Sequence, residues 1–256
     1  WRDSRSIRLP AAAVGVAGKV VWSGARGVAD LDSGTEITTD TAFDIASVSK
    51  QFTATAALLL AGAGKLSLGD PLADYVTGLP AWSRTVTISE LIHQTSGIPD
   101  YVGLLYDAGY RDGDRTTNAD ALKALAEVQG LEFEPGTQWD YSNSNYLLLG
   151  IVVEAVSGAS LPDLLSAEVF KPLGLDMVLD PARPVPTLAA SYTKDDGNYA
   201  VAPSAWEQTG DGSIQTTPSQ LVIWADNYRT GAVGGPELLA AQVDDAVNTG
   251  AETGER

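Results

Sequence analysis

The 256-residue chain contains no cysteine and a single histidine, His93. Without cysteine the chain cannot form disulfide bonds, thiolate metal sites or a thiolate nucleophile. The absence of thiols is compatible with both an oxidising and a reducing compartment. With one histidine, a zinc site is not expected. A His-dependent triad would have to use His93, and no Gly-x-Ser-x-Gly motif supplies the matching nucleophile. We therefore expect a structural role for His93 near a helix end, and neither a metal nor a cofactor.

Positive charge is also scarce, and long apolar runs are missing. The chain has 16 Lys and Arg residues against 33 Asp and Glu residues, a formal net charge of -17. A surface this acidic repels phosphate backbones and anionic membranes, so we expect no nucleic-acid partner. No apolar run reaches the roughly 18 residues that a membrane span needs. The hydrophobic content of 44% is typical of a globular chain with a core.

Two short strands are predicted near the N-terminus. Apolar and small residues alternate over 14–16, Ala17-Gly18 can turn, and a second strand is predicted over 19–28. Two short strands do not make a stable sheet, so further strands are expected to complete it.

Helical patterns dominate the middle of the chain. Thr87 and Glu90 have the spacing of a capping box, and Thr217 and Gln220 repeat it with proline at the first helical position. The predicted helices span residues 88–97, 119–130, 145–158, 219–228 and 236–247. Strands at the start followed by helices predict an α/β body with a helical insertion.

Two Ser-x-x-Lys motifs occur, at Ser47–Lys50 and at Ser191–Lys194. The Ala- and Leu-rich segment 51–60 predicts a helix after Lys50, so Ser47 and Lys50 would share a face at its first turn. The helix dipole and burial would there favour an uncharged amine that accepts the proton of a weak serine nucleophile. The alternative is a helix N-cap at Ser47 with Lys50 in solvent. Lys194 precedes the turn sequence DDGN, so we interpret the second motif as a chance match.

The segment WDYSNSNYLLLG contains a second candidate group. Tyr141 and Asn143 are two residues apart just before a predicted helix, and in an extended segment their side chains point the same way. A phenol near a lysine can shuttle protons, and a carboxamide can donate to a substrate carbonyl. The alternative is a turn in which Ser142 or Asn143 caps the helix and Tyr141 packs on it.

Several blocks of the sequence, taken in order, resemble the serine β-lactamase-related hydrolases. The blocks are GVADLDSGTEITTDTAFDIASVSKQFTATAALLL, GKLSLGDPLADYV, TISELIHQTSGIPDY, EPGTQWDYSNSNYLLLGIVVEAVSG, VFKPLGLDM and GDGSIQTTPSQLVIWA. Within these hydrolases, the blocks resemble the branch of class C β-lactamases, D-Ala-D-Ala carboxypeptidases and related esterases. The resemblance implies an α+β fold: an α/β sandwich body with an antiparallel sheet at 1–66 and 205–256, and an inserted, mainly helical domain at 67–204.

The resemblance also implies roles for the two candidate groups. Ser47 would attack a peptide, ester or β-lactam carbonyl and form an acyl-enzyme, while Lys50 and Tyr141 share the proton transfers. Asn143 would help to hold the substrate amide. The oxyanion would bind the backbone N–H of Ser47 and a second N–H from a strand at the sheet edge. The segment 100–114 is expected to be a loop at the edge of this site.

Aromatic residues in that loop leave two interpretations open. Tyr101 and Tyr106 are available to stack on a ligand, which would make Tyr101 a substrate-binding residue. The alternative is a surface loop with packed aromatics.

One family motif, Lys/His-x-Gly on the strand that supplies the second oxyanion donor, is not found. The sequence NTG at 248–250 has a similar shape but the wrong first residue. We therefore expect the C-terminal strands to be missing from this chain, and a second polypeptide to supply them if the chain is active. The alternatives are a catalytically silent relative that binds peptidoglycan-like ligands or a protein partner, and an inert fragment. The resemblance further implies an exported or extracellular location.

Overall fold

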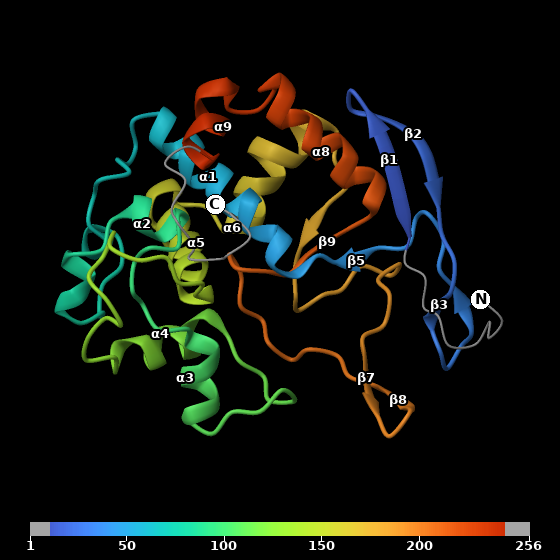
Figure 1. Cartoon of the computed structure of the whole chain (residues 1–256), viewed down its shortest axis with the longest axis horizontal. Helices are drawn as coiled ribbons and strands as arrows, with labels where there is room; N and C mark the ends of the chain where they lie inside the picture. Colours follow the sequence, from blue (N-terminus) through green and yellow to red (C-terminus); the bar gives the residue numbers. More distant parts are fainter. Residues whose placement is uncertain (1–10, 244–256) are drawn as a thin grey trace.

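The computed structural model describes residues 11–243. Figure 1 shows small sheets on one side of the molecule and a cluster of helices on the other. The strands are β1 (Ala12–Val16), β2 (Lys19–Gly24), β3 (Val28–Asp30), β4 (Thr35–Glu36), β5 (Phe43–Asp44), β6 (Val178–Leu179), β7 (Tyr192–Asp195), β8 (Asn198–Val201) and β9 (Ile214–Thr216). The helices are η1 (Ala46–Ser49), α1 (Lys50–Gly62), η2 (Leu72–Asp74), η3 (Ala81–Arg84), α2 (Ile88–Ile92), α3 (Tyr101–Asp107), α4 (Asn118–Ala126), α5 (Asn143–Ser157), α6 (Leu161–Leu165), η4 (Ser166–Phe170), α7 (Lys171–Leu173), α8 (Pro218–Thr230) and α9 (Gly235–Val243).

The predicted N-terminal hairpin is β1 paired antiparallel with β2. Its turn is at Ala17 and Gly18, with φ values of 48° and 73°, as the tight turn between two strands requires. The hairpin packs on α8, and a Cβ added at Gly15 would lie 2.1 Å from the Val222 side chain. The predicted second strand was too long, because β2 ends at Gly24 and the chain then begins β3.

The strand that leads into the Ser47 segment belongs to a three-stranded antiparallel sheet with the order β5-β9-β6. Phe43 pairs with Thr216 and Asp44 with Gln215, so β9 brings the segment after residue 210 alongside β5. The pairs β3-β4 and β7-β8 form separate two-stranded sheets, and the β7-β8 hairpin projects away from the helices in Figure 1.

The hydrophobic core lies between helices α1, α5 and α8. Phe52 on α1 is fully buried, and its ring lies 4.3 Å from that of Trp224 on α8 and 5.7 Å from that of Phe170. Leu147, Leu148, Leu149, Val152 and Val153 of α5 are also buried, because most of that helix is surrounded by protein. This packing fixes the start of α1 against the start of α5, which positions the candidate site. The division into two domains stays a prediction.

Each predicted helix is present at least in part, but the residues at which the helices begin and end differ from those predicted. Thr87 and Glu90 form the reciprocal capping box at α2, but α2 ends at Ile92, and Gln94 then takes a positive φ of 59°. Thr217 caps α8, whereas the Gln220 side chain accepts from the N–H of Asp176 rather than completing a box. The last predicted helix, at 236–247, corresponds to α9, and its residues beyond 243 lie outside the described residues.

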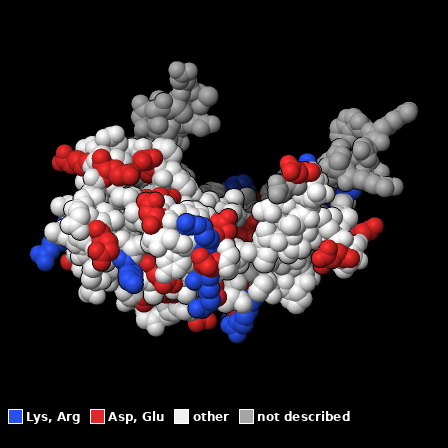
Figure 2. Space-filling view, turned by 90° about the horizontal axis from the view of Figure 1, so that it is seen from below, with Lys and Arg blue, Asp and Glu red and all other residues white. Residues whose placement is uncertain are grey.

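The surface in Figure 2 carries Asp and Glu side chains spread over the visible face, with Lys and Arg interspersed. Within residues 11–243, no single helix has the length and apolarity to cross a membrane. Only α5 together with the segment Leu161–Leu173, bent by 77° between them, has the length and composition of a span. Most of α5 is buried in the core described above.

Candidate functional site

Ser47 lies on the short helix η1, directly after β5. The preceding residue, Ala46, has a φ of 45°, an uncommon conformation for a residue with a side chain. Its N–H donates to Asp44 Oδ1 at 2.8 Å, which holds the turn between strand and helix. The side chain of Ser47 is exposed and caps no helix. The N-cap alternative for Ser47 therefore does not apply.

The hydroxyl of Ser47 contacts both predicted proton-transfer partners. Its Oγ lies 2.6 Å from Tyr141 Oη and 3.1 Å from Lys50 Nζ. Ser47 and Lys50 are three residues apart where η1 continues into α1, and in a 3₁₀ turn such side chains eclipse. Tyr141 comes from the loop before α5 and is 42% exposed, and its hydroxyl also lies 3.3 Å from Asn143 Oδ1.

Lys50 is 7% exposed and connects three segments of the chain. Besides Ser47 Oγ, Nζ bonds Asn143 Oδ1 at 2.8 Å and the backbone oxygen of Asp211 at 2.7 Å. These last two oxygens can only accept. A neutral amine can donate its two hydrogens to them and keep its lone pair for the Ser47 proton, whereas an ammonium donates to all three. Nζ also lies 5.0 Å from the centre of the Tyr141 ring.

Asn143, the first residue of α5, forms hydrogen bonds through both the oxygen and the nitrogen of its side-chain carboxamide. Its Oδ1 accepts from Lys50, and its Nδ2 donates to Asp100 Oδ2 at 2.9 Å. The backbone N–H of Asn143 donates to the same carboxylate oxygen at 3.1 Å. One hydrogen of Nδ2 remains for a further acceptor, because the carboxamide has two.

Tyr101 is buried, with 3% of its side chain exposed, so the prediction that it stacks on a ligand is corrected. Its hydroxyl donates to Asp211 Oδ2 at 2.9 Å. Burial first, and then the Asp211 charge, raises the pKa of Tyr101 well above its ordinary value. Tyr106 is the exposed tyrosine of the segment, and its ring lies 5.5 Å from that of Trp206.

Asp211 is a site residue that the sequence did not indicate. Its carbonyl accepts from Lys50 and its Oδ2 from Tyr101, while its Oδ1 is buried without a hydrogen-bond partner among the described residues. Burial raises the pKa of the Asp211 carboxyl, and the positive charge of Lys50 opposes this. Its only sequence signal is an acidic residue in GDGS, which is too common to indicate a site.

The segment after α2 supports the Tyr141 loop. Gln94 Oε1 accepts from the N–H of Ser142 at 3.0 Å and also from Asn145 Nδ2. The His93 ring follows the last turn of α2, where Nδ1 lies 2.8 Å from the oxygen of Ser89, as expected for a residue near a helix end.

The second Ser-x-x-Lys motif does not form a pair. Lys194 lies on the β7-β8 hairpin, is exposed, and is placed over the Tyr199 ring at 5.5 Å. Residues three apart in this extended segment point to opposite faces, so Ser191 and Lys194 diverge.

Comparison with known proteins places the chain in a family. A family model described as Beta-lactamase matches residues 4–256, and the chain belongs to this family. The chain is 31% identical over 223 residues to penicillin-binding protein 4* of Bacillus subtilis, covering 80% of this chain and 48% of that protein. It is 30% identical over 214 residues to a D-aminopeptidase of Brucella anthropi, covering 81% of this chain and 40% of that one. The chain thus spans about half, or less, of the length of these curated relatives.

Solved structures show the same fold. The octameric penicillin-binding protein homologue from Pyrococcus abyssi has a TM-score of 0.78 and 25% identity, over 87% of this chain and 53% of that one. EstCE1, a hydrolase with promiscuous acyltransferase activity, has a TM-score of 0.78 and 25% identity, over 96% and 74%. The predicted relationship and the β-lactamase/transpeptidase-like α+β fold are confirmed.

Proposed function

We propose that the protein is a serine hydrolase in which Ser47 forms an acyl-enzyme with a peptide, ester or β-lactam carbonyl. The observation that carries the proposal is the contact of Ser47 Oγ with both Tyr141 Oη at 2.6 Å and Lys50 Nζ at 3.1 Å. A serine hydroxyl is a weak nucleophile unless an adjacent group takes its proton, and here two groups are within reach. The chain's relatives include a penicillin-binding protein and a D-aminopeptidase, consistent with acyl transfer.

In this mechanism the proton of Ser47 passes to the Lys50–Tyr141 pair as Oγ attacks the carbonyl carbon. The pair then gives the proton to the leaving amine or alkoxide, so that the acyl group stays on Oγ as an ester. Water, activated by the same pair, attacks this ester and releases the acid. The N–H of Ser47, in the first turn of η1 where intrahelical acceptors are lacking, is suited to bind the oxyanion. Asn143 retains one Nδ2 hydrogen for the substrate.

Covalent labelling tests the proposal. After incubation with a fluorophosphonate or a penicillin, mass spectrometry of peptides should find an adduct on Ser47. Ser47→Ala should abolish it, whereas Ser191→Ala, in the second Ser-x-x-Lys motif, should leave it unchanged. An absence of adduct with either reagent, in the complete assembly, would favour the second candidate: a silent relative that binds peptidoglycan-like ligands or a protein partner.

We further propose that a second polypeptide segment completes the sheet beside β1, and that labelling is fast only in its presence. Within the described residues, β1 pairs with β2 alone, and this hairpin exposes Val14 by 52%, Val16 by 62% and Trp22 by 56%. An apolar strand with an unpaired edge is a template for another strand. Intact mass analysis of the native protein should detect the added segment, and its removal should slow labelling. Full labelling by the 256-residue chain alone would contradict the proposal. We also propose that the chain consists of an α/β body at 1–66 and 205–256 and a mainly helical domain at 67–204. The protein is proposed to be exported.

A further inference from the structure

Asp100, the residue before α3, uses both oxygens of its carboxylate. Oδ1 accepts from the N–H of Val102 at 2.8 Å and so caps α3. Oδ2 accepts twice from Asn143, from the backbone N–H at 3.1 Å and from Nδ2 at 2.9 Å. Because an ionised carboxylate can only accept, a hydrogen of the Asn143 carboxamide must point at Asp100. The nitrogen end of that carboxamide is therefore fixed on the Asp100 side.

The orientation of the Asn143 carboxamide decides which group Lys50 meets. With Nδ2 on the Asp100 side, Oδ1 lies 2.8 Å from Lys50 Nζ and 3.3 Å from Tyr141 Oη. If the carboxamide were turned over, its NH₂ group would face the amine and the phenol instead. An ammonium has no acceptor for that group, and a neutral amine would accept from it with the lone pair that the Ser47 proton needs. Only one of the two orientations therefore leaves Lys50 able to act as a base.

The segment that carries Asp100 is also held to α5 by hydrogen bonds that do not involve its carboxylate. The hydroxyl of Ser144 donates to the backbone oxygen of Pro99 at 2.6 Å and accepts from the N–H of Tyr101 at 2.8 Å. Ser144 is fully buried, so these bonds are shielded from water. We therefore expect a substitution at residue 100 to leave the segment in place, which separates the effect of the carboxylate from that of the segment.

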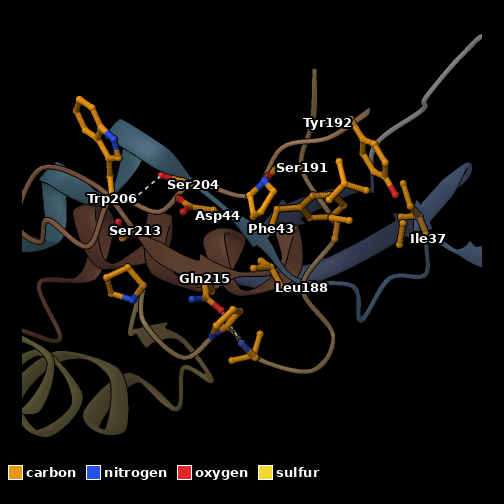
Figure 3. Close-up of a pocket in the computed structure, with 18 of the residues that line it drawn as sticks. Ile37, Phe43, Asp44, Leu188, Ser191, Tyr192, Ser204, Trp206, Ser213 and Gln215 are labelled. Atoms are coloured by element: carbon orange, nitrogen blue, oxygen red, sulfur yellow. Dashed lines mark hydrogen bonds between the residues drawn. The ribbon is translucent and has the colours of Figure 1, made fainter. Parts of the chain in front are cut away.

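Two further carboxylates lie near the site and have other partners. Asp44 accepts from the N–H of Ala46 and lines a cavity of about 560 Å³, where Figure 3 shows it among the lining residues. The carboxylate of Asp211 accepts from the hydroxyl of Tyr101. Within residues 11–243, neither of these carboxylates has a hydrogen bond to the side chain of a proposed catalytic or substrate-binding residue. Asp100 differs from both because its carboxylate reaches such a side chain directly.

We propose that Asp100 is a positioning residue, which fixes the Asn143 carboxamide with its oxygen towards Lys50. The same contact leaves one Nδ2 hydrogen free for a substrate carbonyl. Asp100 acts through Asn143 and does not itself touch the reacting atoms. Its effect on the reaction at Ser47 rests on the proposed function, whereas the orientation of the carboxamide does not depend on it.

The rate at which a fluorophosphonate labels Ser47 in the complete assembly tests this role. Asp100→Ser keeps an oxygen that can cap α3, because serine and aspartate are comparable N-caps, but it has no second oxygen for Asn143. We expect labelling to slow at least about tenfold, since a misplacement of about 1 Å can cost about 10²-fold. The matched control Asp120→Asn alters the capping box of α4, where the carboxylate bonds Thr117, and should leave the rate unchanged. An Asp100→Ser variant that labels as fast as the unmodified protein would overturn the proposal.

A double-mutant cycle separates positioning from a merely structural role. Asn143→Ala removes the carboxamide through which Asp100 acts. Adding Asp100→Ser to that variant should therefore change the labelling rate by less than about twofold, the limit within which independent effects normally add. A structural role instead predicts the same further loss with and without the carboxamide, and that result would contradict positioning through Asn143.

Nuclear magnetic resonance of the side-chain amides tests the orientation without any reaction. In isotope-labelled Ser47→Ala protein, the amide signal that disappears on Asn143→Ala belongs to Nδ2. A hydrogen donated to a carboxylate forms a strong, charge-assisted bond, so its resonance should lie downfield and should move upfield in Asp100→Ser. A signal that does not move would refute the assigned contact. If the signal moves as expected and Ser47 takes no label from any reagent, the proposed function fails and the positioning of Asn143 stands.

Discussion

Replacement of Lys50 by Met tests the amine at the centre of the site while keeping the volume of its side chain. Met is unbranched and flexible, so it suits a buried position that is 7% exposed. The variant loses the bonds from Nζ to Ser47 Oγ, Asn143 Oδ1 and the Asp211 oxygen. The first two oxygens keep Tyr141 Oη as a partner, at 2.6 and 3.3 Å. The carbonyl of Asp211 is the acceptor left without one.

The structural and chemical costs of Lys50→Met can therefore be separated. An unpaired buried carbonyl lowers the free energy of unfolding by about 1–3 kcal/mol. Loss of a general base slows acylation by about 10²–10⁴-fold, equivalent to about 2.7–5.5 kcal/mol of transition-state stabilisation. The assays are urea unfolding and the rate of fluorophosphonate labelling of Ser47, with Lys194→Met as the exposed control. A folded Lys50→Met variant that labels at the rate of the unmodified protein would refute the role of Lys50 as a base.

Three further substitutions test other parts of the site. Tyr141→Phe should slow labelling about 10²-fold or more with little loss of stability, because the phenol contacts the nucleophile, whereas Tyr106→Phe should change neither quantity. Asp211→Asn should alter how stability depends on pH. The folded-state pKa of this carboxyl is raised, so its contribution to stability is lost as the pH rises through that pKa, at up to about 1.4 kcal/mol per pH unit. Urea unfolding from pH 4 to pH 8 should show a smaller decline in the variant, and an unchanged decline would contradict the burial argument. Gly210→Ala should destabilise the fold by at least about 2 kcal/mol, since φ is 100° and the new Cβ would lie 2.4 Å from a backbone oxygen of α5. Gly212→Ala, whose nearest contact would be 3.8 Å, should cost much less, and equal melting temperatures for the two variants would argue against the clash.

Local pattern made the pairing of Ser47 with Lys50 one of two interpretations, because residues three apart at a helix start share a face, and the family resemblance decided between this pair and a helix N-cap. The contact of Tyr141 with this pair came from family resemblance, since 94 residues separate it from Ser47. Neither source indicated Asp211, whose partners Tyr101 and Lys50 are 110 and 161 residues away in the chain.

Burial of Tyr101 was not predictable from its neighbours in sequence. A tyrosine suits both a ligand edge and a core with a hydrogen-bond partner, and only the position of Asp211 decides between these environments. The strands β6 and β9, of two and three residues, are too short for apolar alternation to indicate them. They form because β9 pairs with β5 and β6 on its two edges.

The exposed hairpin β1-β2 has a consequence for the behaviour of the protein in concentrated solution. Among the described residues, β1 has no second partner strand, and where the proposed second segment is absent two copies can meet at this edge beside the exposed Val14 and Val16, while the net charge of -17 keeps them apart. That repulsion is screened beyond about 10 Å at 0.1 M salt, and the apolar attraction is not weakened by salt. Self-association should therefore increase with ionic strength, the reverse of the behaviour of proteins that attract one another through charge.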